Sequence, residues 1–487
     1  MTGDRATESR ATAAHATAAH ATAVHSTEVP PTTTTTKGLH PGLTRRQISM
    51  MGLGGAIGAG LFVGSGQAIS IAGPAVLVSY LVAGGIVVLV MAMLAEMVAA
   101  RPSSGAFSSY AQKAMGRSAG SAVGWLYWIQ LVVVIAAEAT GAGGIVSAWT
   151  PGIPAWAWVL IFVVALTAVN LFGVRNYGRF EFWFAAIKVA AIIAFLVVGV
   201  CAIVGLIPGL PATGIANLVD NGGFAPNGIT GIAGALLIVV FAFGGTEVVA
   251  IAAAESNDPA RNIRRIVREV LVRILVFYVG SIFVIVAVLP WNDPAVKDGP
   301  FSAVLDTLNV PGVGLVMDLI VVIALLSAMN ANIYGASRMA YSLGERGLAP
   351  LAATRTSLKG VPFVAVLASV AFGFVTVGLN WAFPDVVLPA LLNVVGSTLL
   401  VIWTATAVSQ IILRRRADRA DEVMPMRMWG FPWLSWLCLV LLAAVTALSM
   451  IDEAARTQLL LTLGLTAVLL VVARATRAVA RPGVVRE

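Results

Sequence analysis

The residues from Gly52 to Gly66 have the clearest potential for chemistry, because seven of these fifteen residues are glycine within an otherwise apolar segment. A chain that leaves its helix at Gly58-Ala59-Gly60 exposes N–H groups at the start of one half-helix and carbonyl groups at the end of the other. Those groups suit a zwitterion, with its carboxylate on the N–H groups and its ammonium on the carbonyls. The alternative is that the glycines only let helices approach closely. We expect a broken substrate-binding helix.

Two candidate side chains lie on one later apolar segment. Glu138 is isolated in the sequence VVVIAAEATGAG, and Tyr127 precedes it on the same predicted helix. An ionisable group so deep in a membrane is costly and is by default functional. Glu138 therefore needs a partner from another helix, a proton or the ammonium of a ligand. We expect it at the substrate pocket, with a purely structural hydrogen bond as the alternative.

Lys188 is a second charged residue inside an apolar segment. It follows Glu181 by seven residues, which places it about 10 Å inside the end of the helix. Its ammonium could return to the interface by snorkelling, or it could be held inside, desolvated, and exchange a proton. All four histidines lie at or before His40, so carboxylates or Lys188 must serve if protons are coupled.

A second interrupted segment places the glycine pair Gly244-Gly245 just before Glu247. Gly58 and Gly244 are 186 residues apart, and the segments that begin near Gly120 and Val313 are 193 apart. This spacing fits two halves of five helices, each opening with a glycine-broken helix. An odd number of helices in each half requires the repeats to be inverted, with a binding site near the midplane.

The composition requires a membrane to hold these elements. Of 487 residues, 59% are hydrophobic and 11% are charged, against about 25% charged in soluble domains. The sequence predicts an all-α integral membrane protein with twelve transmembrane helices, formed by a 5+5 inverted repeat with broken helices 1 and 6 and two C-terminal helices. The predicted spans are 48–73, 74–99, 119–148, 155–173, 181–207, 228–253, 271–291, 312–341, 361–380, 384–412, 431–451 and 457–475.

The distribution of charge predicts the orientation. With the N-terminus inside, 28 of the 31 Lys and Arg residues fall in cytoplasmic segments, while Lys297 and Arg456 fall outside and Lys188 lies within a span. This is a strong positive-inside pattern, so we expect both termini in the cytoplasm and the protein in the plasma membrane. The net charge of +8 therefore indicates no nucleic-acid partner, and the basic clusters, including Arg414 to Arg416, are candidates to contact anionic lipid.

We expect three further features of the domain organisation. A disordered cytoplasmic tail covers residues 1–42, the transporter domain covers 43–475, and a C-terminal tail covers 476–487. Repeat one would span about 43–210, repeat two about 226–413, and the extra helices about 430–475. We expect no cofactor and no metal, because the chain has no nucleotide-binding loop, nucleophile motif or metal-ligand cluster, and it is not expected to be an enzyme.

Several motifs resemble one family. GGAIGAGLFVGSG, FAFGGTE, Glu255 followed by NDPARNI, SRMAYSLGERGLAP and LLNVVGS are similar to those of amino-acid permeases in the amino acid–polyamine–organocation superfamily, nearest the bacterial GABA and neutral amino-acid branch. The resemblance covers about residues 43 to 475. It implies the 5+5 fold with two extra helices and proton-driven uptake of an amino acid. Position 59 is more often threonine in this branch, so Ala59 removes a hydroxyl beside the carboxylate site.

The resemblance also implies roles for individual residues. The carboxylate-binding turn falls on Ile57, Gly58, Ala59 and Gly60, and the helix 6 platform falls on Phe241, Ala242, Phe243, Gly244 and Gly245. Lys188 and Glu247 match the positions of the helix 5 lysine and the helix 6 acid, which we expect to couple transport to protons. Three functions stay open: an amino acid:proton symporter, an amino-acid exchanger, and a non-transporting nutrient sensor. Permeases for cationic or aromatic amino acids are alternatives within the first two.

Overall fold

The structure is a computed structural model, and all the regular secondary structure in the part of the chain that it describes is helical. The predicted N-terminal tail, most of the predicted C-terminal tail and Glu247 lie outside the described residues. The described residues are 57–103, 105–172, 177–246, 259–308, 310–358 and 360–479.

Each of the twelve predicted spans contains helix, which confirms the all-α membrane fold. Within the described residues, eight helical stretches are long and apolar enough by themselves to cross a bilayer, and shorter apolar helices occupy Gly228–Ala242, Ile274–Val288 and Trp433–Ser449. The span helices are α2 (Ala59–Phe62) with α3 (Gly64–Ala72), α4 (Val76–Ala100), α6 (Arg117–Trp149), α7 (Ala155–Phe172), α8 (Tyr177–Val204), α9 (Gly228–Ala242), α11 (Pro259–Val288), α14 (Val313–Glu345), α15 (Phe363–Ala382), α16 (Pro384–Arg419), α17 (Trp433–Ser449) and α18 (Glu453–Val479).

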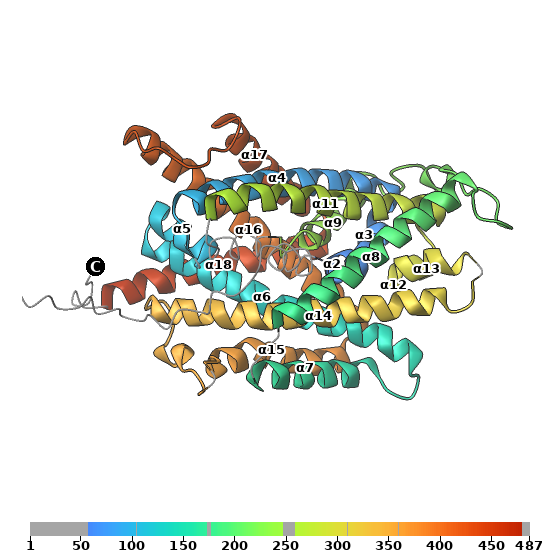
Figure 1. Cartoon of the computed structure of the whole chain (residues 1–487), viewed down its shortest axis with the longest axis horizontal. Coiled ribbons are helices and arrows are strands. Elements are labelled where there is room, and N and C mark those ends of the chain that lie inside the picture. Colours follow the sequence, from blue (N-terminus) through green and yellow to red (C-terminus); the bar gives the residue numbers. More distant parts are fainter. Residues whose placement is uncertain are drawn as a thin grey trace, which may run out of the picture. The chain divides into compact units, whose positions relative to one another are not determined.

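The pairing of helices follows the inverted repeat. Each of the first four spans packs against the span five positions later: α3 on α9, α4 on α11, α6 on α14 and α7 on α15. Figure 1 shows α4 beside α11, α6 beside α14, and α7 beside α15. A pseudo-two-fold axis between two repeats brings an element against its own counterpart in this way. The two glycine-interrupted spans are therefore neighbours, although they are far apart in the sequence.

Three short helices outside the predicted spans complete the bundle. α5 (Ala106–Met115) lies between spans 2 and 3 and packs against α6 and α16, while α12 (Pro294–Asp298) and α13 (Pro300–Asp306) lie between spans 7 and 8. The helix that contains the seventh span begins earlier than the predicted span, at Pro259 rather than near 271, although its apolar part is Ile274–Val288. Proline is well suited to the first position of a helix because its missing N–H would have no helical partner there. The polar turns after Pro259 carry no apolar signal, which is why the hydropathy pattern misses them.

The two C-terminal helices pack onto the ten-helix core. α17 contacts α4, α9 and α16, and α18 contacts α6, α9 and α16. A buried hydrogen bond joins the hydroxyls of Ser397 in α16 and Thr462 in α18 at 2.6 Å. The core that these helices enclose holds the interruption of helix 1 at its centre.

Candidate substrate site

The described helix of span 1 begins at the place where the sequence predicts the interruption. Gly58 has a non-helical backbone (φ −147°, ψ −145°), and α2 starts at Ala59 without any side-chain cap from Gly58. Val63 then separates α2 from α3. The amide of Ala59 therefore stands at the start of a helical segment, where it has no carbonyl partner within the helix.

The partner of that amide is Glu138. Both carboxylate oxygens accept from the N–H of Ala59, Oε1 at 3.1 Å and Oε2 at 3.0 Å. Glu138 is only 3% exposed and comes from α6, so it joins span 3 to the interruption of span 1. The approach is so close that a Cβ on Gly58 would lie 2.3 Å from Oε1. The carboxyl group of Glu138 thus occupies the position for which the sequence predicts the carboxylate of the substrate.

Helix 6 opens beside helix 1. α9 ends at Ala242, and the amide of Gly244 donates back to the carbonyl of Phe241 at 2.8 Å in a tight turn. Gly245 follows with φ +87°, a conformation that residues with a Cβ rarely adopt. A Cβ on Gly60 would lie 2.5 Å from the Cα of Ala242. The two interrupted spans therefore touch backbone to backbone at Gly60 and Ala242.

A small cavity lies between these two interruptions. Its volume is about 10 Å³, which is about enough for the centre of one water molecule. An amino acid would need the surrounding helices to separate. The lining residues come from spans 1, 3, 6 and 8 and are Gly58, Gly60, Gln130, Val134, Glu138, Phe241, Ala242, Gly244, Gly245 and Asn332.

Three of the lining residues were missed by the sequence reasoning. Gln130 and Val134 precede Glu138 by eight and four residues, so all three share one face of α6. Helical spacing from Glu138 could have found the first two. Asn332, on α14, donates its amide to the carbonyl of Ala328 at 2.8 Å. No hydrogen-bond partner is found for Oε1 of Gln130 in the described part of the chain, although this atom is buried.

Lys188 lies inside the bundle. Its side chain is 0% exposed, so the alternative in which its ammonium snorkels to the interface is wrong. The helix that carries it, α8, packs against α14. Lys188 also lies close enough to Glu138 for their charges to interact. Lys188 and Glu138 are therefore both buried inside the bundle, and their charges interact.

Four of the residues that the sequence predicts to bind substrate do not line the cavity. Tyr127 packs its ring edge-on against Phe107 of α5, with ring centroids 5.3 Å apart. Phe243 stacks on Tyr278 of α11, with ring centroids 5.0 Å apart. Ile57 is fully buried beside the interruption. Ala59 reaches the site through its backbone amide alone.

The donor set does not suit a metal ion. Among the described residues no group of three His, Cys, Asp or Glu side chains could hold one. The site instead combines backbone amides, two amide side chains, one carboxylate and one ammonium. These groups can bind a small zwitterion and exchange a proton.

Comparisons with known proteins identify the family. A family model for amino acid permeases matches residues 47–479. The chain is 49% identical to the aromatic amino acid transport protein AroP of Corynebacterium glutamicum over 87% of this chain and 92% of that protein. It is 46% identical to the gamma-aminobutyric acid permease of Escherichia coli strain K12 over 81% of this chain and 85% of that protein.

A solved structure agrees on the fold. A manganese transporter of Eremococcus coleocola superposes with a TM-score of 0.53 at 18% identity, covering 88% of this chain and 92% of that chain. At that identity the structural similarity supports the fold alone. The family match spans nearly the whole membrane part of the sequence and supports membership of the family. The chain is a multi-pass membrane transporter that belongs to the amino acid permease family.

Proposed function

We propose that this permease imports an amino acid, with GABA or a neutral amino acid favoured, across the plasma membrane by proton symport, with both termini in the cytoplasm. One observation carries the proposal: the interruptions of helices 1 and 6 meet at a cavity whose lining includes a buried carboxylate. Backbone of this kind, inside a membrane, lines the site of many transporters. The positive-inside charge pattern supports the orientation.

The substrate would bind by exchange of partners. The substrate carboxylate would accept hydrogen bonds from the backbone N–H groups of Gly58, Ala59 and Gly60. Glu138 would then give up its hydrogen bond with Ala59 and pair with the substrate ammonium instead. Glu138 already stands within 3.1 Å of the Ala59 nitrogen, so this exchange needs a change of rotamer and a separation of helices 1 and 6. The carbonyls of Phe241 to Gly245 would form the opposite wall.

Protons would be coupled through the buried charges. Lys188 is fully buried and interacts with the charge of Glu138. A proton on Lys188 balances the carboxylate while the site is closed, and its loss would leave an uncompensated buried charge, which is strongly unfavourable. Glu247, at the matching position of helix 6, is the proposed second proton carrier.

Aromatic amino acids form the second candidate class of substrate. The relative from C. glutamicum is named as an aromatic amino acid transport protein, and the one from E. coli as a GABA permease. Both substrate classes share the amino and carboxylate groups that the backbone site would bind. Exchange of one amino acid for another is the alternative to symport.

Uptake by the purified protein in liposomes tests the proposal. We expect labelled GABA or a neutral amino acid to accumulate when the vesicle lumen is more alkaline than the outside, and accumulation to stop when an ionophore collapses the gradient. A panel of amino acids, compared first by thermal shift, identifies the substrate because a ligand of the folded state raises its apparent stability. Uptake that needs an amino acid inside the vesicles and ignores the proton gradient would indicate an exchanger.

A further inference from the structure

A larger cavity lies at the other end of span 2, far along α4 from the interruption of helix 1. Its volume is about 380 Å³, which is within the range of small-molecule sites. The C-terminal turns of α4 and α16, the helix α5 and the segment after α16 form its walls. We call this the basic-end cavity, because the end of the bundle where it lies carries Arg101, Lys113 and Arg414 to Arg416.

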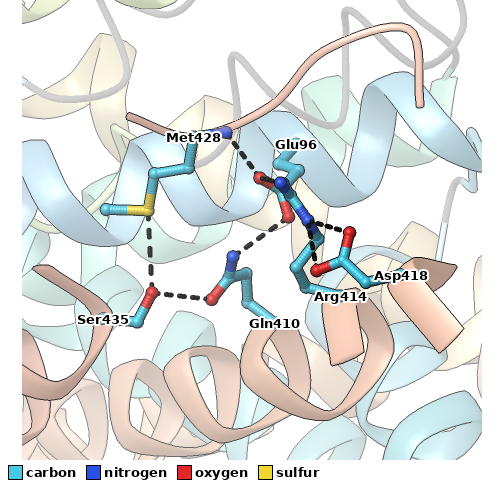
Figure 2. A network of polar contacts seen from close by, with 6 residues as sticks. All are labelled: Glu96, Gln410, Arg414, Asp418, Met428 and Ser435. Atoms are coloured by element: carbon cyan, nitrogen blue, oxygen red, sulfur yellow. Dashed lines mark hydrogen bonds and ion pairs between the residues drawn. The ribbon is translucent and has the colours of Figure 1, made fainter. Parts of the chain in front are cut away.

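Its floor is a buried ionic network. Figure 2 shows the carboxylate of Glu96 facing Arg414, Gln410 and the backbone of Met428. Arg414 donates to Glu96 at 2.8 Å and to Asp418 at 3.0 Å. Glu96 and Arg414 therefore satisfy each other, and the floor offers no unpaired cation to a ligand.

The rim of the cavity is more basic than its floor. Arg101 pairs with Glu422 at 2.9 Å, but both side chains are half exposed. Arg416 donates to the backbone carbonyls of Lys113 and Ala114, at the end of α5. Lys113 has no carboxylate within ion-pair distance among the described residues, and its ammonium lies 5.8 Å from the ring centroid of Tyr110.

Lys113 is an exposed cation at the rim of the cavity, near a like charge. Partial burial, followed by the like charge of Arg101, lowers its pKa below the ordinary value. An anion placed between the two cations would reverse both effects, because it would neutralise their repulsion and solvate the ammonium. A phosphate diester accepts hydrogen bonds from Arg and Lys at once.

Apolar side chains form the rest of the wall. Met97 and Ala100 of α4 face the cavity together with Leu413 of α16 and Met424 of the following segment. A site for a free inorganic anion gains nothing from such a wall. A molecule with a charged head and a hydrocarbon chain gains about 0.8 kcal/mol for each buried CH₂.

We propose that the basic-end cavity binds one anionic phospholipid, with its phosphate between Arg101 and Lys113 and the start of an acyl chain against Met97 and Leu413. The lipid comes from the leaflet at this end of the bundle, which the charge pattern predicts to be cytoplasmic and therefore rich in anionic lipid. It would add a further connection between α5, α4 and α16, which already contact one another. The proposal concerns a second site and does not depend on which amino acid is transported.

Native mass spectrometry of the purified protein with phosphatidylglycerol and phosphatidylcholine tests the proposal. We expect one phosphatidylglycerol to be retained at least tenfold more strongly than phosphatidylcholine, and Lys113→Gln to abolish this preference. Arg415→Gln is the matched control, because Arg415 is exposed on the same turn as Arg414 and Arg416 but does not line the cavity. An equal loss of the preference for phosphatidylglycerol in Lys113→Gln and Arg415→Gln would overturn the proposal, because it would indicate a general attraction of the lipid to basic residues.

A second measurement separates a lipid from a free anion. Ala100→Trp fills the apolar part of the cavity and leaves every charge in place, so it should reduce phosphatidylglycerol retention at least tenfold. Thermal unfolding of the unaltered protein should shift upward with short-chain phosphatidylglycerol and not with glycerol 3-phosphate. Equal stabilisation by the two compounds, or unchanged lipid retention in Ala100→Trp, would overturn the lipid assignment.

Discussion

At the scale of single residues, the most informative contact is that of Glu138 with the backbone of helix 1. A buried carboxylate is costly unless it is hydrogen-bonded and paired. Here the Ala59 amide supplies the hydrogen bonds and the charge of Lys188 supplies the electrostatic partner. The same amide is the group that would bind a substrate carboxylate, so Glu138 and the substrate compete for it.

This competition gives the first prediction. Glu138→Gln keeps the size of the side chain and one acceptor oxygen, but it removes the charge that faces Lys188 and that would receive the substrate ammonium. We expect uptake to fall at least a hundredfold while the amount of protein in the membrane stays within twofold. The measurement is initial uptake in proteoliposomes, normalised to the reconstituted protein.

Glu345→Gln is the matched control for Glu138→Gln, because Glu345 is exposed at the end of α14. It should transport normally. If Glu138→Gln also transports at the unaltered rate, Glu138 is a structural hydrogen-bond acceptor and not part of the substrate site.

Gln130 gives the second prediction at this scale. Its buried side-chain oxygen faces the cavity without a hydrogen-bond partner in the described residues, and such an atom rejects substrates that cannot donate to it. Gln130→Leu should therefore change the order of substrate affinities by at least tenfold for amino acids with a polar side chain, and less for apolar ones. Competition of unlabelled amino acids against the labelled substrate measures this order, and an unchanged order would exclude Gln130 from selectivity.

At the scale of elements, the two interrupted helices depend on each other. Gly60 and Ala242 approach so closely that a Cβ at position 60 would lie 2.5 Å from the Cα of Ala242. Backbone cannot move aside as a flexible side chain can. The glycines of helix 1 therefore serve both the interruption and the close packing that the sequence left as alternatives.

Gly60→Val should separate the two elements. We expect substrate binding to be lost, while the protein still inserts because neither the apolar length nor the charge of the span changes. Gly85→Val is the control, since a Cβ at Gly85 meets nothing within 4 Å. Isothermal titration with the identified substrate measures both variants, and unchanged affinity in Gly60→Val would contradict the proposed site.

The elements were also where the sequence was most informative. Hydropathy found every span, because a bilayer demands about twenty apolar residues wherever a helix crosses it. Glycine clusters found the start of the described helix in span 1 and the end of α9 in span 6. The hydropathy pattern missed α5 and the polar start of α11, because neither is a strongly apolar segment that crosses the bilayer. Each is stabilised by its contacts with other helices.

The side chains at the site were only partly predictable. Glu138 stood out because a charge in an apolar span is rare, while Gln130 and Asn332 are uncharged and gave no such signal. Tyr127 and Phe243 are on the correct helices, but they face α5 and α11. Which way a side chain points around a helix depends on how neighbouring helices pack, and an all-round apolar span contains no periodic pattern that reveals it.

At the scale of the whole molecule, the ionic network at Glu96 holds the core and the C-terminal helices together. Glu96 belongs to α4, Arg414 and Gln410 belong to α16, and Ser435 of α17 donates to Gln410 at 2.9 Å. Figure 2 shows these groups converging from segments more than 300 residues apart in the chain. Their pairing fixes the position of span 11.

Glu96→Gln should destabilise the protein by about 3–5 kcal/mol, because breaking a buried ion pair leaves the other charge uncompensated. Asp418 still contacts Arg414, so the lower end of that range is expected. Glu422→Gln, which breaks the half-exposed pair with Arg101, should cost about 0–1 kcal/mol. Thermal unfolding of the two variants in the same detergent compares their stabilities. Equal losses of stability in Glu96→Gln and Glu422→Gln would show that the Glu96 network is not a structural connection.

The last prediction concerns the coupling of transport to protons. Lys188 is fully buried, its charge interacts with Glu138, and its helix packs against α14. In the proposed mechanism a proton on Lys188 would stabilise the closed arrangement of helices 1 and 8, and its release would let them separate, because a conformational equilibrium shifts by the difference in interaction energy between its two states. Lys188→Met keeps the length of the side chain and removes the titratable group. We expect it to bind the substrate and to exchange internal for external amino acid at a rate within tenfold of the unaltered protein, but to accumulate none above equilibrium when a proton gradient is imposed.

Full accumulation by Lys188→Met would assign coupling to another group, and the loss of exchange as well as accumulation would assign Lys188 a structural role.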